Sequence, residues 1–94
     1  MNKDYQDKLE VANRLLRPFL DEGIDDALVI EKLEGIGFRR ICNNGYVYSG
    51  KHVKIRYDYF GINSFNVTLE DNKKESSSEA RKVLSKIINA IEDL

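Results

Sequence analysis

Apolar residues near the beginning of the chain recur at intervals of three or four, which predicts a helix from about residue 4 to residue 17. Pro18 has no backbone N–H and clashes with the preceding turn, so we expect the helix to end or kink there. The stripe could pack on its own domain or on a second copy of the chain, so a homodimer through this N-terminal helix (residues 1–22) stays open. The stripe consists of Tyr5, Leu9, Ala12 and Leu16.

A second helix is predicted over residues 26–35. Asp25 or Asp26 is suited to its N-cap, because an aspartate accepts hydrogen bonds from the first backbone N–H groups of a helix. Gly35 and Gly37 are expected to end it, since glycine readily adopts the left-handed conformation that follows a helix. Its apolar side consists of Leu28, Ile30 and Leu33.

The clearest strand is predicted over residues 52–60, where apolar and polar side chains alternate. Because successive side chains of a strand point to opposite faces, one set should face the core and the other should face outward. The expected core-facing set is Val53, Ile55, Tyr57 and Tyr59, and the expected outward set is His52, Lys54, Arg56, Asp58 and Phe60.

Shorter strands are predicted on both sides of this one, at residues 38–43 and at residues 65–69. The pair Asn44-Gly45 is typical of a tight hairpin turn after the first of them. The sequence leaves open whether Tyr46–Ser49 forms a separate strand that returns from this turn.

The last helix has an apolar stripe with a period of 3.6 residues. Ser76 followed by Glu79 fits a capping box at its beginning. We therefore expect the polar run of residues 71–78 to be a loop. The stripe consists of Ala80, Val83, Leu84, Ile87, Ile88, Ile91 and Leu94.

These elements predict an α+β fold of order α-α-β-β-(β)-β-α in a single domain, residues 1–94. Each helix must bury its apolar stripe and the sheet must bury one face, so we expect a two-layer sandwich. An antiparallel β-meander of three or four strands would carry the helices on one face, with residues 24–94 as the α-β-α core. The second face of the sheet would contact water or a partner.

Composition agrees with one globular domain: the chain has 94 residues, of which 41% are hydrophobic and 33% charged. One cysteine and one histidine exclude a disulfide framework and a Cys/His zinc site. No apolar run approaches the roughly 20 residues of a membrane span. The first ten residues lack the apolar core of a signal peptide, so we expect a cytoplasmic protein without a membrane segment.

Charge is unevenly distributed, because residues 1–35 carry a net charge of −4 and residues 36–94 a net charge of +3. An acidic turn at residues 21–26 could contact a basic partner, although carboxylates at a helix N-terminus also act as caps. The outward face of the long strand is the other candidate surface. The residues predicted to bind a protein partner are Lys54, Arg56, Phe60, His52, Asp21, Glu22, Asp25 and Asp26.

An alternative is an RNA-binding domain that uses the basic and aromatic sheet of residues 38–60 and the beginning of the last helix. Such a surface stacks bases and binds phosphates. The overall pI of about 5.8 argues against a dedicated nucleic-acid binder. The residues predicted for this alternative are Arg39, Arg40, Lys54, Arg56, Lys73, Lys74, Arg81 and Lys82.

Catalysis has little support in the sequence. Nucleophile-elbow, zinc-protease and P-loop patterns are absent, so we expect no cofactor and no metal. Cys42 and His52 would form a nucleophilic pair if their strands were neighbours. The ordinary alternative is a small buried cysteine and a solvated histidine.

Residues 24–94 resemble, in the order of their elements, two groups of α-β-β-β-α proteins. The run Leu33-Glu34-Gly35-Ile36-Gly37-Phe38 before Asn44-Gly45 resembles the opening of HicA-type toxins, which implies a ribonuclease, although Tyr46 stands where those toxins carry a histidine. The run Gly50-Lys51-His52, with Lys73-Lys74 before Ala80-Arg81-Lys82, resembles double-stranded-RNA-binding domains, which implies RNA binding.

The hypothesis that we favour from the sequence is a small non-catalytic protein-interaction module. Stand-alone chains of this size with many asparagines, lysines and isoleucines are typical of phages and other mobile elements. There they act as inhibitors or regulators of a larger host protein.

Overall fold

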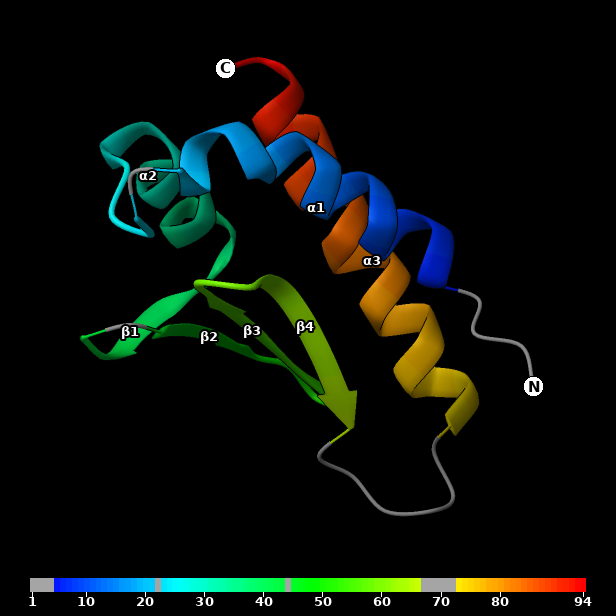
Figure 1. Cartoon of the computed structure of the whole chain (residues 1–94). Helices are drawn as coiled ribbons and strands as arrows, with labels where there is room; N and C mark the ends of the chain where they lie inside the picture. Colours follow the sequence, from blue (N-terminus) through cyan, green and yellow to red (C-terminus); the bar gives the residue numbers. More distant parts are fainter. Residues whose placement is uncertain (1–4, 22, 44, 67–72) are drawn as a thin grey trace.

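The computed structural model of the chain describes residues 5–21, 23–43, 45–66 and 73–94. In chain order the elements are α1 (Gln6–Leu20), α2 (Ala27–Ile36), β1 (Arg39–Cys42), β2 (Gly45–Ser49), β3 (Val53–Asp58), β4 (Gly61–Asn66) and α3 (Lys73–Glu92), as Figure 1 shows. The predicted α+β class is confirmed, and residues 45–49 form a strand of their own.

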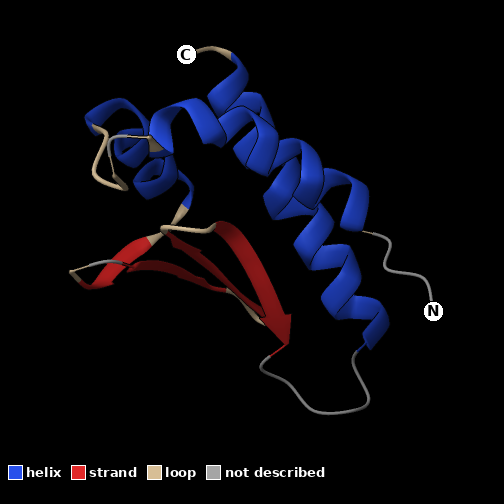
Figure 2. Ribbon diagram, in the orientation of Figure 1, coloured by secondary structure: helices blue, strands red, loops and turns tan. Residues whose placement is uncertain are grey.

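The four strands of the described residues form one antiparallel sheet in the order β1-β2-β3-β4. Short turns join neighbouring strands, so the sheet is a meander. The helices lie together on one side of it, and the other side is bare in the described part of the chain (Figure 2). The protein is therefore a two-layer sandwich, as its sequence predicts.

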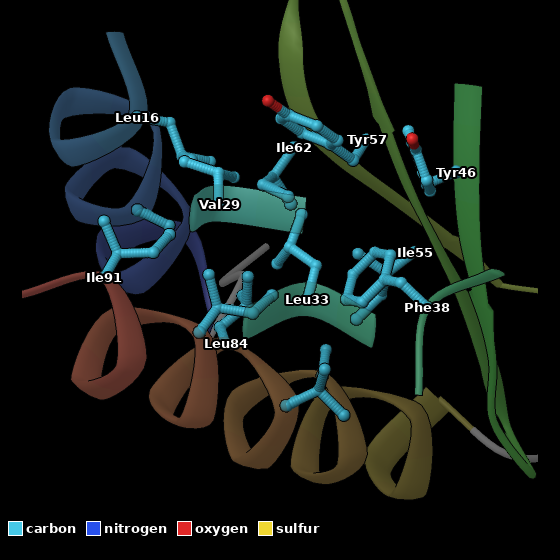
Figure 3. Close-up of a cluster of buried hydrophobic side chains, with 14 of the residues drawn as sticks. Leu16, Val29, Leu33, Phe38, Tyr46, Ile55, Tyr57, Ile62, Leu84 and Ile91 are labelled. Atoms are coloured by element: carbon cyan, nitrogen blue, oxygen red, sulfur yellow. The ribbon is translucent and has the colours of Figure 1, made fainter. Parts of the chain in front are cut away.

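The hydrophobic core lies between the sheet and the helices (Figure 3). In β3 the alternation places Val53, Ile55 and Tyr57 in the core, while Lys54 and Arg56 are half-buried on the opposite face. All three helices and three of the strands supply one continuous cluster of buried side chains. Helical residues in this cluster are Ala12, Leu16, Val29, Leu33, Ala80, Val83, Leu84, Ile87 and Ile91.

Helix α1 packs its apolar stripe against the chain's own core. Ala12 and Leu16 are fully buried, and Tyr5 and Leu9 are partly buried against the same cluster. Much of the stripe is therefore covered within one chain, and a homodimer through it stays a prediction. The helix continues for two residues after Pro18, because the side chains that follow also pack on the core.

The ends of α2 agree with the sequence prediction. The side chain of Asp26 accepts hydrogen bonds from the backbone N–H groups of Leu28 and Val29, at 2.9 and 3.2 Å. Gly37 ends the helix with φ of +130°, a conformation that favours glycine.

The prediction that Tyr59 faces the core is wrong, because β3 ends at Asp58, two residues before the predicted end at residue 60. The carboxylate of Asp58 accepts a hydrogen bond from the backbone N–H of Phe60 at 2.9 Å, which begins the turn into β4. Alternation stops at this turn, and Tyr59 and Phe60 are both exposed. His52 likewise precedes β3, so it lies in the β2–β3 turn and not on the sheet.

Helix α3 begins at Lys73, so the predicted loop over residues 71–78 is wrong from Lys73 onward. Ser76 therefore lies inside the helix, and Glu79 has a tertiary role in place of the expected capping box. Its carboxylate accepts hydrogen bonds from the backbone N–H groups of Lys51 (2.8 Å) and His52 (2.6 Å) and holds the β2–β3 turn against α3. The predicted strand residues 67–69 lie outside the described residues.

Candidate interaction surface

The bare face of the sheet carries a row of residues that pair in register across all four strands. Arg39 pairs with Val47, Val47 with Arg56, and Arg56 with Asn63. Residues paired in this way share one face of a sheet. Lys54 lies two positions from Arg56 in β3 and therefore points to the same face.

Exposed apolar side chains lie at one end of this face. A methyl group at Gly45 would contact Cys42 Sγ at 3.4 Å, Ile41 Cγ1 at 3.7 Å and Arg56 Nε at 3.8 Å, so these three side chains gather over the glycine. Ile41 is 55% exposed. Phe60, in the β3–β4 turn beside this end, is 87% exposed. Exposed apolar surface marks an interaction site when it is contiguous, so the nearness of Ile41 and Phe60 to the same strand ends makes this end of the sheet the candidate.

We define the outer sheet face as the surface formed by Arg39, Ile41, Lys54 and Arg56, together with Phe60 in the adjoining β3–β4 turn. Arg56 Nε lies 3.3 Å from Asp58 Oδ2, which holds the guanidinium group over the sheet. Three cations and one acidic neighbour leave this face basic. Ile41 was not a predicted site residue, because the register shift between Arg40 and Cys42 that exposes it has no local sequence signal.

The predicted partner-binding residues do not form one surface. Lys54 and Arg56 lie on the outer sheet face, and Phe60 lies in the adjacent turn. His52 lies at the opposite end of β3, against α3. Sequence alternation alone therefore placed His52 on the wrong surface, because the strand begins one residue later than expected.

The acidic turn is largely engaged within the protein. Asp26 caps α2, and Asp25 accepts hydrogen bonds from Arg40 and from the hydroxyl group of Tyr46, both at 3.0 Å. Asp21 is exposed at the end of α1, and Glu22 lies outside the described residues. Asp25 and Asp26 therefore have structural roles, which weakens the hypothesis of an acidic docking patch.

The guanidinium group of Arg40 donates to several partners of its own chain. Besides Asp25, it donates to the hydroxyl oxygen of Tyr46 at 2.9 Å, to the carbonyl of Cys42 at 3.1 Å and to the carbonyl of Asn43 at 2.9 Å. It also lies over the ring of Tyr46, 5.4 Å from the centroid. Arg40 thus connects β1, β2 and the segment before α2. Most of its N–H donors already have acceptors within the chain and are not available to a phosphate.

The burial of Tyr46 and Tyr57 should make the stability of the protein depend on pH at high pH. Burial raises the pKa of Tyr46 above its usual value, and the carboxylate of Asp25, which accepts its hydrogen bond, raises it further. Burial also strongly raises the pKa of Tyr57. A raised folded-state pKa contributes stability that is complete below the unfolded-state pKa, about 10, and is lost as the pH rises above it.

We therefore expect the free energy of unfolding to fall above pH 10, by up to about 1.4 kcal/mol per pH unit for each buried tyrosine. Urea unfolding between pH 8 and 11.5 measures this slope. Tyr46→Phe should make the decline shallower, and Tyr59→Phe, which changes an exposed side chain, should leave it as in the wild type. Equal slopes in the wild type and both variants would show that Tyr46 does not contribute to the decline in stability.

Cys42 and His52 do not form a catalytic pair. Cys42 pairs with Gly45, which is opposite the last residue of β3, whereas His52 precedes its first residue. Six strand residues at about 3.3 Å and two inter-strand spacings of about 4.8 Å place the two roughly 20 Å apart. Cys42 is also exposed, so the expectation of a small buried cysteine is wrong.

The residues of the RNA-binding alternative fall on separate surfaces. Arg39, Lys54 and Arg56 lie on the bare side of the sheet, while Arg81 and Lys82 are exposed on α3 in the opposite layer. Arg40 is engaged as described above. Lys73 and Lys74 lie in the first turn of α3, and their side chains are outside the description.

Within the described residues, no group of three histidine, cysteine or carboxylate side chains is arranged to hold a metal ion. No helix of this part of the chain is long and apolar enough to cross a membrane. Comparison with protein-family models, with curated proteins and with solved structures found no match for the chain.

Proposed function

We propose that this chain is a small non-catalytic module that binds a larger protein through its outer sheet face. The observation that carries the proposal is the exposure of Ile41 on a basic sheet face that no described helix covers, with the exposed Phe60 in the adjoining turn. Burying two such side chains on a partner removes apolar surface from water, and aromatic side chains are frequent energetic centres of interfaces.

The chemistry of this face suits a partner surface with an apolar pocket surrounded by carboxylates. Phe60 and Ile41 would fill the pocket, and Arg39, Lys54 and Arg56 would face the acidic rim. Charges at the rim of an interface mainly raise the association rate and make it sensitive to salt. We further propose that the protein acts in the cytoplasm, as an inhibitor or regulator of its partner.

The experiment begins with an affinity pull-down from lysate of the source organism, with and without nuclease. The captured protein is then tested against the double variant Ile41→Ala/Phe60→Ala. We expect at least a tenfold rise in Kd, which corresponds to about 1.4 kcal/mol. The thermal unfolding midpoint should change little, because both side chains are exposed.

Leu28→Ala is the matched control, because Leu28 is as exposed as Ile41 but lies on α2, in the other layer. It should leave the Kd within twofold of the wild type. The proposal is wrong if both variants bind the partner equally well, or if nuclease removes every captured protein.

A further inference from the structure

A basic groove lies on the helix side of the protein, away from the outer sheet face. It consists of two adjoining pockets that share Ser78 and Lys82 of α3. The first, of about 330 Å³, is completed by Lys51, His52 and Glu79. The second, of about 270 Å³, is completed by Lys8 of α1 together with Arg81 and Ser85 of α3.

Three elements that are distant in sequence bring four cations to this groove. Lys8 comes from the first turn of α1, Lys51 from the β2–β3 turn, and Arg81 and Lys82 from α3. The side chains of these four residues form no ion pair with the described carboxylates. Four like charges that are gathered around one carboxylate, Glu79, repel one another, so an anion bound between them is favoured.

The carboxylate in the groove does not cancel this charge completely. Glu79 directs its two oxygens to the backbone N–H groups of Lys51 and His52, at 2.8 and 2.6 Å. It therefore fixes the β2–β3 turn beside α3 and positions Lys51 at the groove. The hydroxyl groups of Ser78 and Ser85 add donors of the kind that phosphate oxygens accept.

We propose that this groove binds the phosphate backbone of a single-stranded nucleic acid. Two open pockets side by side, with one lysine common to both, match a chain of successive phosphates better than one small enclosed anion. Backbone contacts of this kind carry no sequence information, so the binding is independent of base sequence. The proposal rests on residues other than those of the outer sheet face and is independent of the protein-binding proposal.

The test is fluorescence anisotropy with a labelled 12-nucleotide polyuridine RNA at 50 mM salt, repeated as the salt concentration rises. We expect the double variant Lys51→Ala/Lys82→Ala to weaken binding at least tenfold. It should also reduce the slope of log affinity against log salt by about 0.7 for each lysine that contacts a phosphate. Polycytidine RNA and polythymidine DNA of the same length should bind within a few-fold of polyuridine.

Lys86→Ala is the matched control, because Lys86 is exposed about one turn further along α3 and does not line either pocket. Its affinity should stay within twofold of the wild type, as should that of Ile41→Ala/Phe60→Ala. Equal weakening by Lys86→Ala and by Lys51→Ala/Lys82→Ala would overturn the assignment to the groove. Absence of oligonucleotide binding at 50 mM salt, or binding of inorganic phosphate alone, would overturn the proposal itself.

Discussion

Replacing Leu33 with alanine should lower the free energy of unfolding by about 3–5 kcal/mol, the cost of a cavity in a well-packed core. Leu33 is fully buried on α2 and lies among core side chains of the helices and the sheet (Figure 3). Urea unfolding at neutral pH gives the free energy. In a domain of this size each kcal/mol also lowers Tm by about 4–8 °C.

The control for this substitution is on the same helix. Leu28→Ala removes the same atoms from a side chain that is 56% exposed, so its effect should be below about 1 kcal/mol. Any difference in helix propensity is the same in both variants. A similar loss in the two proteins would show that Leu33 is not part of the core.

Replacing Gly61 with alanine should cost about 2–4 kcal/mol, from backbone strain and from the loss of a partly buried polar contact. Gly61 has φ of +104°, and a methyl group there would collide with the side-chain amide of Asn13. That amide accepts from the backbone N–H of Ile62 at 2.6 Å and donates to its carbonyl at 3.2 Å. Displacing Asn13 therefore breaks two hydrogen bonds between α1 and β4.

Two other glycines separate these causes. Gly23 has φ of +107° with open space around it, so Gly23→Ala should show the strain alone, about 1–2 kcal/mol. Gly35 lies in α2 with open space, so Gly35→Ala should stabilise the protein by about 0.5–1 kcal/mol. Urea unfolding of the three variants gives the comparison. If Gly61→Ala costs no more than Gly23→Ala, the contact with Asn13 does not contribute to stability.

Periodicity in the sequence was sufficient to predict the layers of the fold. The alternation of Val53, Ile55 and Tyr57 identified the buried face of β3, and the stripe of α3 identified its buried side. Both patterns arise because buried positions recur regularly, about once per turn in a helix and at every second residue in a strand. Periodicity failed at Tyr59, where a single hydrogen bond from Phe60 to Asp58 ends the strand.

Features that depend on tertiary contacts were beyond the reach of local patterns. Glu79 fits a capping box in sequence, but its carboxylate binds a turn 27 and 28 residues away. The neighbours Arg39 and Arg40 look equivalent in sequence, yet one lies on the bare face and the other ties β1 to Asp25. Lys8, Lys51 and Lys82 are too far apart in the chain for spacing to connect them.

The side-chain amide of Asn13 affects whether a strand of another chain can pair with the edge of the sheet. It binds the N–H and the carbonyl of Ile62 on the outer edge of β4, the groups that an added strand would use. At the other edge, a bulge interrupts β1, and Arg40 occupies the carbonyls of Cys42 and Asn43. Among the described residues, each edge of the sheet thus has at least one feature that hinders edge-to-edge pairing, which disfavours recognition by β-augmentation there.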